Sequence, residues 1–307
     1  MFRPWPTPHW AAEPSSTSTG ASKAFLSGSC EETNSKSDVI TLKLYAVIER
    51  YLVNHMDAVV VSVHYCLAPE YPYPIPFEDC LTAIKYLHRH HQHFGRDATQ
   101  ISIAGDSAGA NIAAGIFLKL RDTNQNFLHR QILLSPVTQV SSFLTYSFRD
   151  NAKYAIFIEP TFFLEYINVS TDHADAVCAN EHVVHEEMIH HKARPYLKNY
   201  HKINHEDVVR KEHVARDFGR RIEDPYLCPM MADSLKGLSP ALVLVTEHDP
   251  FRDDALAYAD RLQADGIEME AVRAFGFHRI YYFFDRSVSG GRMIDAVVNY
   301  MRTVYEK

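Results

Sequence analysis

The pentapeptide Gly105-Asp106-Ser107-Ala108-Gly109 constrains the fold most, because of the sequence on either side of it. Residues 100–104 have the character of a short buried strand, and residues 108–119 form a small-residue, apolar pattern typical of a buried helix. In so tight a strand-to-helix turn, side chains flanking the serine would collide with neighbouring backbone, so glycine is needed on both sides. The pattern predicts a nucleophile elbow that holds the Ser107 hydroxyl above the edge of a sheet.

Strand-like and helical patterns alternate along much of the chain. This alternation predicts a mostly parallel sheet with helices on both faces, an α/β fold. The predicted strands are residues 58–63, 100–104, 131–134, 241–246 and 267–274, and the predicted helices are residues 39–52, 77–87, 108–119, 253–264 and 293–304.

Two segments depart from this alternation. Residues 1–26 are dense in Pro, Ser, Thr and Gly, a composition that predicts a flexible leader outside the folded domain of residues 27–307. Residues 141–235 are rich in aromatic, histidine and charged residues and predict a helical insertion, which we call the cap.

Composition excludes several classes of protein. The chain has 31 Lys and Arg against 38 Asp and Glu, a net charge of −7, which excludes a basic protein that reads nucleic acid. No stretch approaches the roughly 20 apolar residues of a membrane span, and no signal peptide is visible, so the chain as written is expected to be soluble and cytoplasmic. Five cysteines without a C-x-x-C spacing predict reduced thiols.

A serine hydroxyl is a poor nucleophile and needs a general base, which in turn needs a group that fixes its tautomer. In chains with this elbow the acid and the histidine follow the serine, in loops just beyond late strands. Asp249 follows the predicted strand 241–246, and His278 follows the predicted strand 267–274. We therefore expect Asp249 to be the acid, His278 the base, and the Ala108 amide an oxyanion donor.

Alternatives to this assignment remain on residues alone. Glu247 lies nearer the strand end than Asp249, whereas Asp253 and Asp254 have the position of a helix cap and first turn. Among the eighteen histidines, His64 and His248 also fall just beyond predicted strands.

The other histidines form two clusters. Neither cluster has the H-E-x-x-H spacing of a zinc peptidase, and the i, i+4 pair within the second is only half a site. We interpret them as solvated polar surface and expect neither a metal nor a cofactor. The clusters are His88, His90, His91 and His93, and His182, His185, His190, His191, His201 and His205.

Four motifs occur in order: VSVHYCLAPEYPYPIPFEDCLTAIKYL, GDSAGAN, LVTEHDPFRDDALAYADRL and GFHRIYYFF. On these, from about Ser27 to the C-terminus, the chain resembles the hormone-sensitive-lipase-like α/β hydrolases, most closely the arylacetamide deacetylase-like serine esterases. The resemblance implies Ser107 as nucleophile, Asp249 as acid, His278 as base, and a cap that shapes the acyl pocket. It implies a small hydrophobic ester or arylacetamide substrate. It also implies tethering at the endoplasmic reticulum as the alternative compartment, and the cap is a candidate for peripheral membrane contact.

The chain departs from the family at its start. The family's His-Gly-Gly-Gly motif, whose amides help to bind the oxyanion, does not occur here. We expect the family's early strands to be missing as well, and Ala108 to remain as one donor, with Gly28 and Ser29 as candidates for a replacement amide. The alternative function is therefore a weak or inactive hydrolase-fold protein that acts as a binding module.

Overall fold

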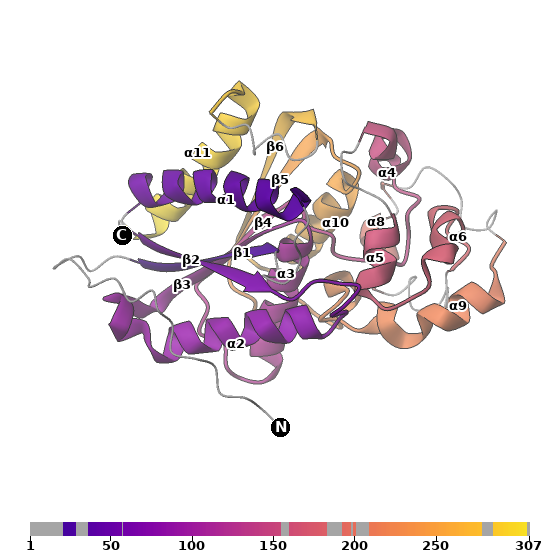
Figure 1. Ribbon diagram of the computed structural model, residues 1–307, viewed down its shortest axis with the longest axis horizontal. Helices are drawn as coiled ribbons and strands as arrows, with labels where there is room; N and C mark the ends of the chain where they lie inside the picture. Colours follow the sequence, from indigo (N-terminus) through magenta and orange to yellow (C-terminus); the bar gives the residue numbers. More distant parts are fainter. Residues whose placement is uncertain are drawn as a thin grey trace.

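A single parallel sheet organises the structure. The computed structural model describes residues 21–28, 36–56, 58–154, 160–182, 192–197, 199–200, 209–277 and 285–305. In these ranges six strands pair in the order β2-β1-β3-β4-β5-β6, every neighbouring pair being parallel (Figure 1). The strands are β1 Ala21–Gly28, β2 Ala58–Tyr65, β3 Asp97–Asp106, β4 Arg130–Leu134, β5 Ala241–His248 and β6 Met269–Phe277.

Helices cover the sheet on both faces, as the alternation predicts (Figure 1). Side chains of β5 alternate between two hydrophobic clusters, because successive residues of a strand point to opposite faces. Leu242 and Leu244 pack with helices α1 (Lys36–His55) and α11 (Val288–Tyr305). Val243 and Val245 belong to the cluster of the other face. That cluster includes α2 (Ile75–Arg89), α3 (Ala108–Asp122) and α10 (Arg252–Ala264).

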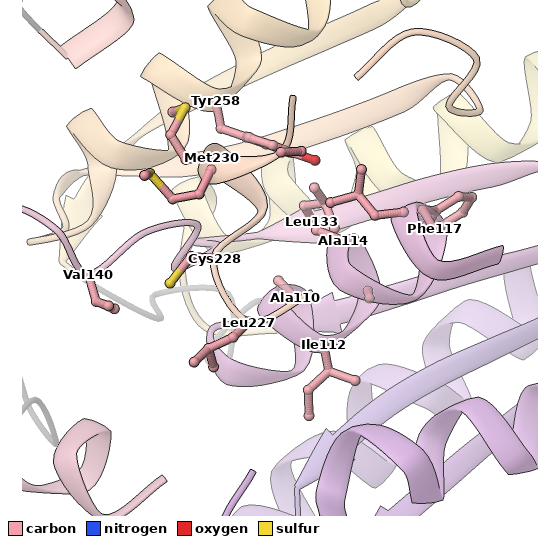
Figure 2. Packing of buried hydrophobic residues seen from close by; sticks show 14 of the residues in the cluster. Ala110, Ile112, Ala114, Phe117, Leu133, Val140, Leu227, Cys228, Met230 and Tyr258 are labelled. Atoms are coloured by element: carbon pink, nitrogen blue, oxygen red, sulfur yellow. The ribbon is translucent and has the colours of Figure 1, made fainter. Parts of the chain in front are cut away.

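Most residues of helix α3 are buried. Ala110, Ile112, Ala114 and Phe117 have no exposed surface and pack with Leu133 of β4 (Figure 2). Figure 2 also shows Leu227, Cys228 and Met230, which lie in the last part of the cap, in the same cluster. The helix that starts at the elbow is therefore fixed both to the sheet and to the far end of the cap.

The cap lies between β4 and β5, and its described residues include several short helices. Figure 1 shows its helices beside the sheet, on the side of α10 and the strand ends. Cap residues such as Leu164, Val177 and Phe218 join the cluster that includes α3, so cap and sheet share one core. The described helices are α4 Tyr146–Asn151, α5 Pro160–Tyr166, α6 Ala174–Cys178, α8 Arg194–Leu197 and α9 Glu212–Phe218, with short 3-10 turns between them.

Strand β1 differs from the sequence expectation. Residues 21–26, assigned to a flexible leader, instead form most of a strand that pairs with β2 on one side and β3 on the other. Composition predicted no order because residues 1–26 taken together are dense in Pro, Ser, Thr and Gly. A strand nevertheless gains its backbone hydrogen bonds from both neighbouring strands, whatever its side chains. The leader prediction for 21–26 is wrong, while residues 1–20 lie outside the described ranges.

Candidate active site

Ser107 is the single residue between β3 and α3. Its φ of 54° and ψ of −111° lie in a region that non-glycine residues rarely adopt, at a cost on the order of 1–3 kcal/mol. Two backbone hydrogen bonds hold it there: its N–H donates to the Leu134 carbonyl (2.8 Å), and its carbonyl accepts from the Asn111 N–H (3.0 Å). The predicted strand–turn–helix unit is confirmed, with the serine at its strained corner.

The residues before Ser107 explain how so tight a turn fits. A Cβ added to Gly105 would lie less than 3.0 Å from the Gly109 carbonyl, so the elbow excludes any side chain at 105. Asp106 is buried at 4% exposure, and its Oδ2 accepts a 2.6 Å hydrogen bond from the Tyr45 hydroxyl of α1. The elbow is thus anchored to the helix layer on the other face of the sheet.

Ala108 opens α3 and is exposed. The first amides of a helix have no acceptor inside the helix and lie at the positive end of its dipole, which suits an anion. Strand β1 ends beside this position, because Leu26 pairs with Gly105 and Gly28 follows two residues later. The chain therefore leaves β1 next to the elbow.

Asp249 lies in the loop directly after β5 and is fully buried. Its Oδ1 accepts a 2.8 Å hydrogen bond from the Phe251 N–H, and its own N–H donates to the Thr246 carbonyl (3.3 Å). Because β3 and β5 are parallel members of one sheet, Ser107 and Asp249 follow strands that end at the same edge.

The three rival acids are held elsewhere. Glu247 pairs with Arg252 (3.0 Å) and with Arg273; burial raises the pKa of this carboxyl, but the two guanidinium groups offset that and leave it below its usual value. Asp253 accepts a hydrogen bond from the Ser147 N–H of the cap (2.7 Å). Asp254 accepts hydrogen bonds from the N–H and the hydroxyl of Thr138, just before the cap.

His278, the predicted base, lies outside the described residues. Phe277, the last residue of β6, pairs in register with His248, the last residue of β5. Strand β6 therefore ends beside the end of β5, the strand that the loop with Asp249 follows. His64 lies on β2, which is separated from β5 by three strands, and the His248 ring lies 5.6 Å from those of Phe275 and Phe277.

One histidine of the predicted solvated clusters is buried. His182 has no exposed surface, its Nε2 donates to the Val140 carbonyl (2.7 Å), and its ring packs on Phe143 and Phe218. The interpretation of His182 as polar surface is wrong, because a cap residue can be buried against the core. No group of three candidate metal ligands occurs in the described ranges.

A polar residue that the sequence did not indicate also supports the elbow. Asn111 lies one turn after Ser107, is 6% exposed, and donates from Nδ2 to the carbonyls of Val137 and Leu227, each at 2.7 Å. The available signal is a lone amide in a helix of small apolar residues, since such a group must find hydrogen bonds when buried.

A parallel sheet with a strained serine between a strand and a buried helix, followed by an acid beyond a later strand, is the architecture of an α/β hydrolase. Within the described ranges, no helix has the length and apolarity to cross a bilayer. Residues 40–183 and 178–279 match the family described as the alpha/beta hydrolase fold, and the chain belongs to that family.

Relatives with curated names agree with the predicted resemblance. Bovine (Bos taurus) arylacetamide deacetylase is 30% identical over 84% of this chain and 68% of its own length. Carboxylesterase NlhH of Mycobacterium tuberculosis is 32% identical over 70% of this chain, which spans 53% of that protein. Among solved structures, an esterase from Pyrobaculum calidifontis has a TM-score of 0.65 and 25% identity, covering 95% of this chain and 77% of that one. The relatives of this chain are thus esterases and deacetylases, and the family is one of serine hydrolases.

Proposed function

We propose that this chain hydrolyses small hydrophobic carboxylic esters or arylacetamides through an acyl-Ser107 intermediate. The observation that carries the proposal is the strained Ser107 between β3 and α3, at the same sheet edge as the buried Asp249. The names of the relatives support the substrate class. The chain spans 68% of the length of the bovine arylacetamide deacetylase and 53% of that of carboxylesterase NlhH.

The proposed chemistry follows from the roles of these groups. His278 takes the Ser107 proton as Oγ attacks the substrate carbonyl, and Asp249 orients the imidazole and stabilises its cation. The Ala108 N–H binds the oxyanion, and Gly28 and Ser29 remain the candidates for a second amide. Collapse expels the alcohol or amine, which takes the proton from His278, and water then releases the acid by the same route. Membrane contact through the cap and the compartment stay predictions.

Labelling with a fluorophosphonate probe tests the proposal, since the probe reacts only with an activated serine. We expect the full chain to be labelled and both Ser107→Ala and His278→Ala to be unlabelled while giving the same circular dichroism spectrum. Hydrolysis of p-nitrophenyl butyrate should follow the same pattern. A folded chain that is not labelled would contradict the proposal and favour the binding-module alternative.

A further inference from the structure

We propose that α4, the first helix of the cap, positions the loop that carries Asp249, and that Ser147 and Asn151 are the positioning residues. We call residues 247–253 the acid loop. The inference rests on the proposed function, because it is that function which makes Asp249 the acid of a triad.

Ser147 makes three hydrogen bonds to the acid loop. Its N–H donates to Asp253 Oδ2 (2.7 Å), its hydroxyl donates to the Pro250 carbonyl (2.8 Å), and the same hydroxyl accepts from the Asp253 N–H (3.0 Å). Ser147 is 1% exposed, so water does not replace these partners when they are lost. One buried hydroxyl therefore holds the residue directly after Asp249 and the first turn of α10.

Asn151 extends this contact along the same face of α4. It lies four residues after Ser147, about one helical turn, and is 6% exposed. Its Nδ2 donates at 3.4 Å to the carbonyls of Glu247 and of Asp249 itself. The two side chains of α4 thus contact the acid loop before, at and after the acid.

The acid loop also has bonds of its own, which fix its shape. Arg252 donates to the Glu247 carbonyl (2.8 Å) and to Asp253 Oδ1 (2.9 Å), and Phe251 donates to Asp249 Oδ1. These bonds join parts of one loop, whereas those from α4 join the loop to a separate element. Within the described ranges, the charged and titratable side chains in and beside the loop are Glu247, His248, Asp249, Arg252, Asp253, Asp254 and Arg273, with Arg149 and Asp150 exposed on α4.

This arrangement links the cap to the chemistry. Since α4 begins the cap insertion, any displacement of the cap's first helix moves the backbone on both sides of Asp249. A misplaced acid orients the imidazole less well and stabilises its cation less, which lowers the pKa of the base as well as the rate. Displacements on the order of 1 Å can cost about a hundredfold in rate.

The test compares Ser147→Ala with a matched control, Ser239→Ala. Ser239 is also a buried serine bonded to a carbonyl, that of Leu128 (2.6 Å), but it precedes the opposite end of β5. For each variant, kcat/KM for p-nitrophenyl butyrate is measured from pH 5 to 9, and amide hydrogen exchange is followed in the peptide that covers the acid loop. Asn151→Ala provides a second, independent variant on the same face of α4.

We expect Ser147→Ala and Asn151→Ala to lower kcat/KM by about ten- to a hundredfold. The acid limb of the pH profile should move to lower pH, and exchange in the acid loop should accelerate. Ser239→Ala should change neither the limb nor that exchange. Equal effects of Ser147→Ala and Ser239→Ala, or unchanged exchange in the acid loop, would overturn the inference. A wild-type chain without activity would contradict the proposed function instead, while the exchange experiment would still decide the role of α4.

Discussion

The side-chain amide of Asn111 donates a 2.7 Å hydrogen bond to the carbonyl of Leu227, a residue 116 positions further along the chain. The same nitrogen binds the carbonyl of Val137, which precedes the cap, whereas Leu227 lies in its last part. One residue of the helix that begins at the elbow therefore ties together the two ends of the cap.

Replacing Asn111 by Ala should destabilise the fold strongly. Both carbonyls would lose a buried donor, at a cost of about 1–3 kcal/mol each, a large part of the 5–15 kcal/mol typical of a domain. Urea unfolding followed by circular dichroism measures this. Asn126→Ala is the matched control, since Asn126 is exposed and donates at 3.2 Å to Gly237; its effect should stay within about 0.5 kcal/mol. Equal losses of stability in the two variants would show that the two hydrogen bonds of Asn111 do not stabilise the fold.

Gly105→Ala should abolish activity and lower the yield of folded protein. The new Cβ would collide with the backbone of Gly109 and Ala110, which cannot move without displacing Ser107. Fluorophosphonate labelling per folded molecule is the measurement. Gly95→Asn is a suitable control, because a Cβ there meets nothing within 4 Å and asparagine tolerates the left-handed conformation of that residue (φ 61°). Normal labelling of Gly105→Ala would show that the elbow tolerates a side chain.

Sequence predicted most of the fold because hydrophobic periodicity and the elbow motif are local signals. The predicted strand 241–246 lies within the observed Ala241–His248, and the predicted helix 253–264 differs from α10 by one residue at its start. Strand β1 was missed because its order comes from pairing with β2 and β3, which no local pattern encodes. Tertiary context also explains His182, which is polar in sequence and buried in the structure.

The candidate site was predictable in part for the same reason. The elbow and the loop after β5 follow from motif and strand order. The partners that distinguish Asp249 from the rival acids come from other elements: Ser147 for Asp253, Thr138 for Asp254 and Arg273 for Glu247. Ser147 was not visible as a candidate, because its importance depends on α4 packing on a loop about a hundred residues away.

His182 should make the protein less stable in acid. Burial lowers the pKa of His182 to about 4, so between pH 6.5 and 4 the unfolded chain binds a proton that the folded chain does not. Stability from this residue is therefore present above pH 6.5 and lost as pH falls towards 4, by about 3 kcal/mol in all. Urea unfolding of wild type and His182→Gln at several pH values measures the difference, which should shrink in acid. A constant difference would contradict a buried, neutral imidazole.

Asp254 should have the opposite effect. Burial raises the pKa of this carboxyl to about 7, so between about pH 4 and 7 the folded chain holds a proton that the unfolded chain has lost. Its contribution to stability is full below pH 4 and is lost as pH rises through 7. Asp254→Asn, which resembles the protonated acid, should gain stability relative to wild type between pH 5 and 8. The same unfolding series checks this, and a gain in acid instead would mean that the carboxyl is ionised in the folded chain.

The choice between Asp249 and Glu247 as the acid can be decided by two isosteric changes. Glu247 is bound to Arg252 and Arg273 on a partly exposed surface, where ion pairs contribute little, so Glu247→Gln should change kcat by no more than about twofold. Asp249 is buried and oriented by the Phe251 amide. Asp249→Asn keeps this shape but removes the acceptor that selects the tautomer of His278, and by analogy with serine proteases kcat should fall about 10³–10⁴-fold. Steady-state hydrolysis of p-nitrophenyl butyrate by the two variants measures both effects. The reverse ranking would assign the acid to Glu247, and the ion pairs with Arg252 and Arg273 would then have to open before catalysis.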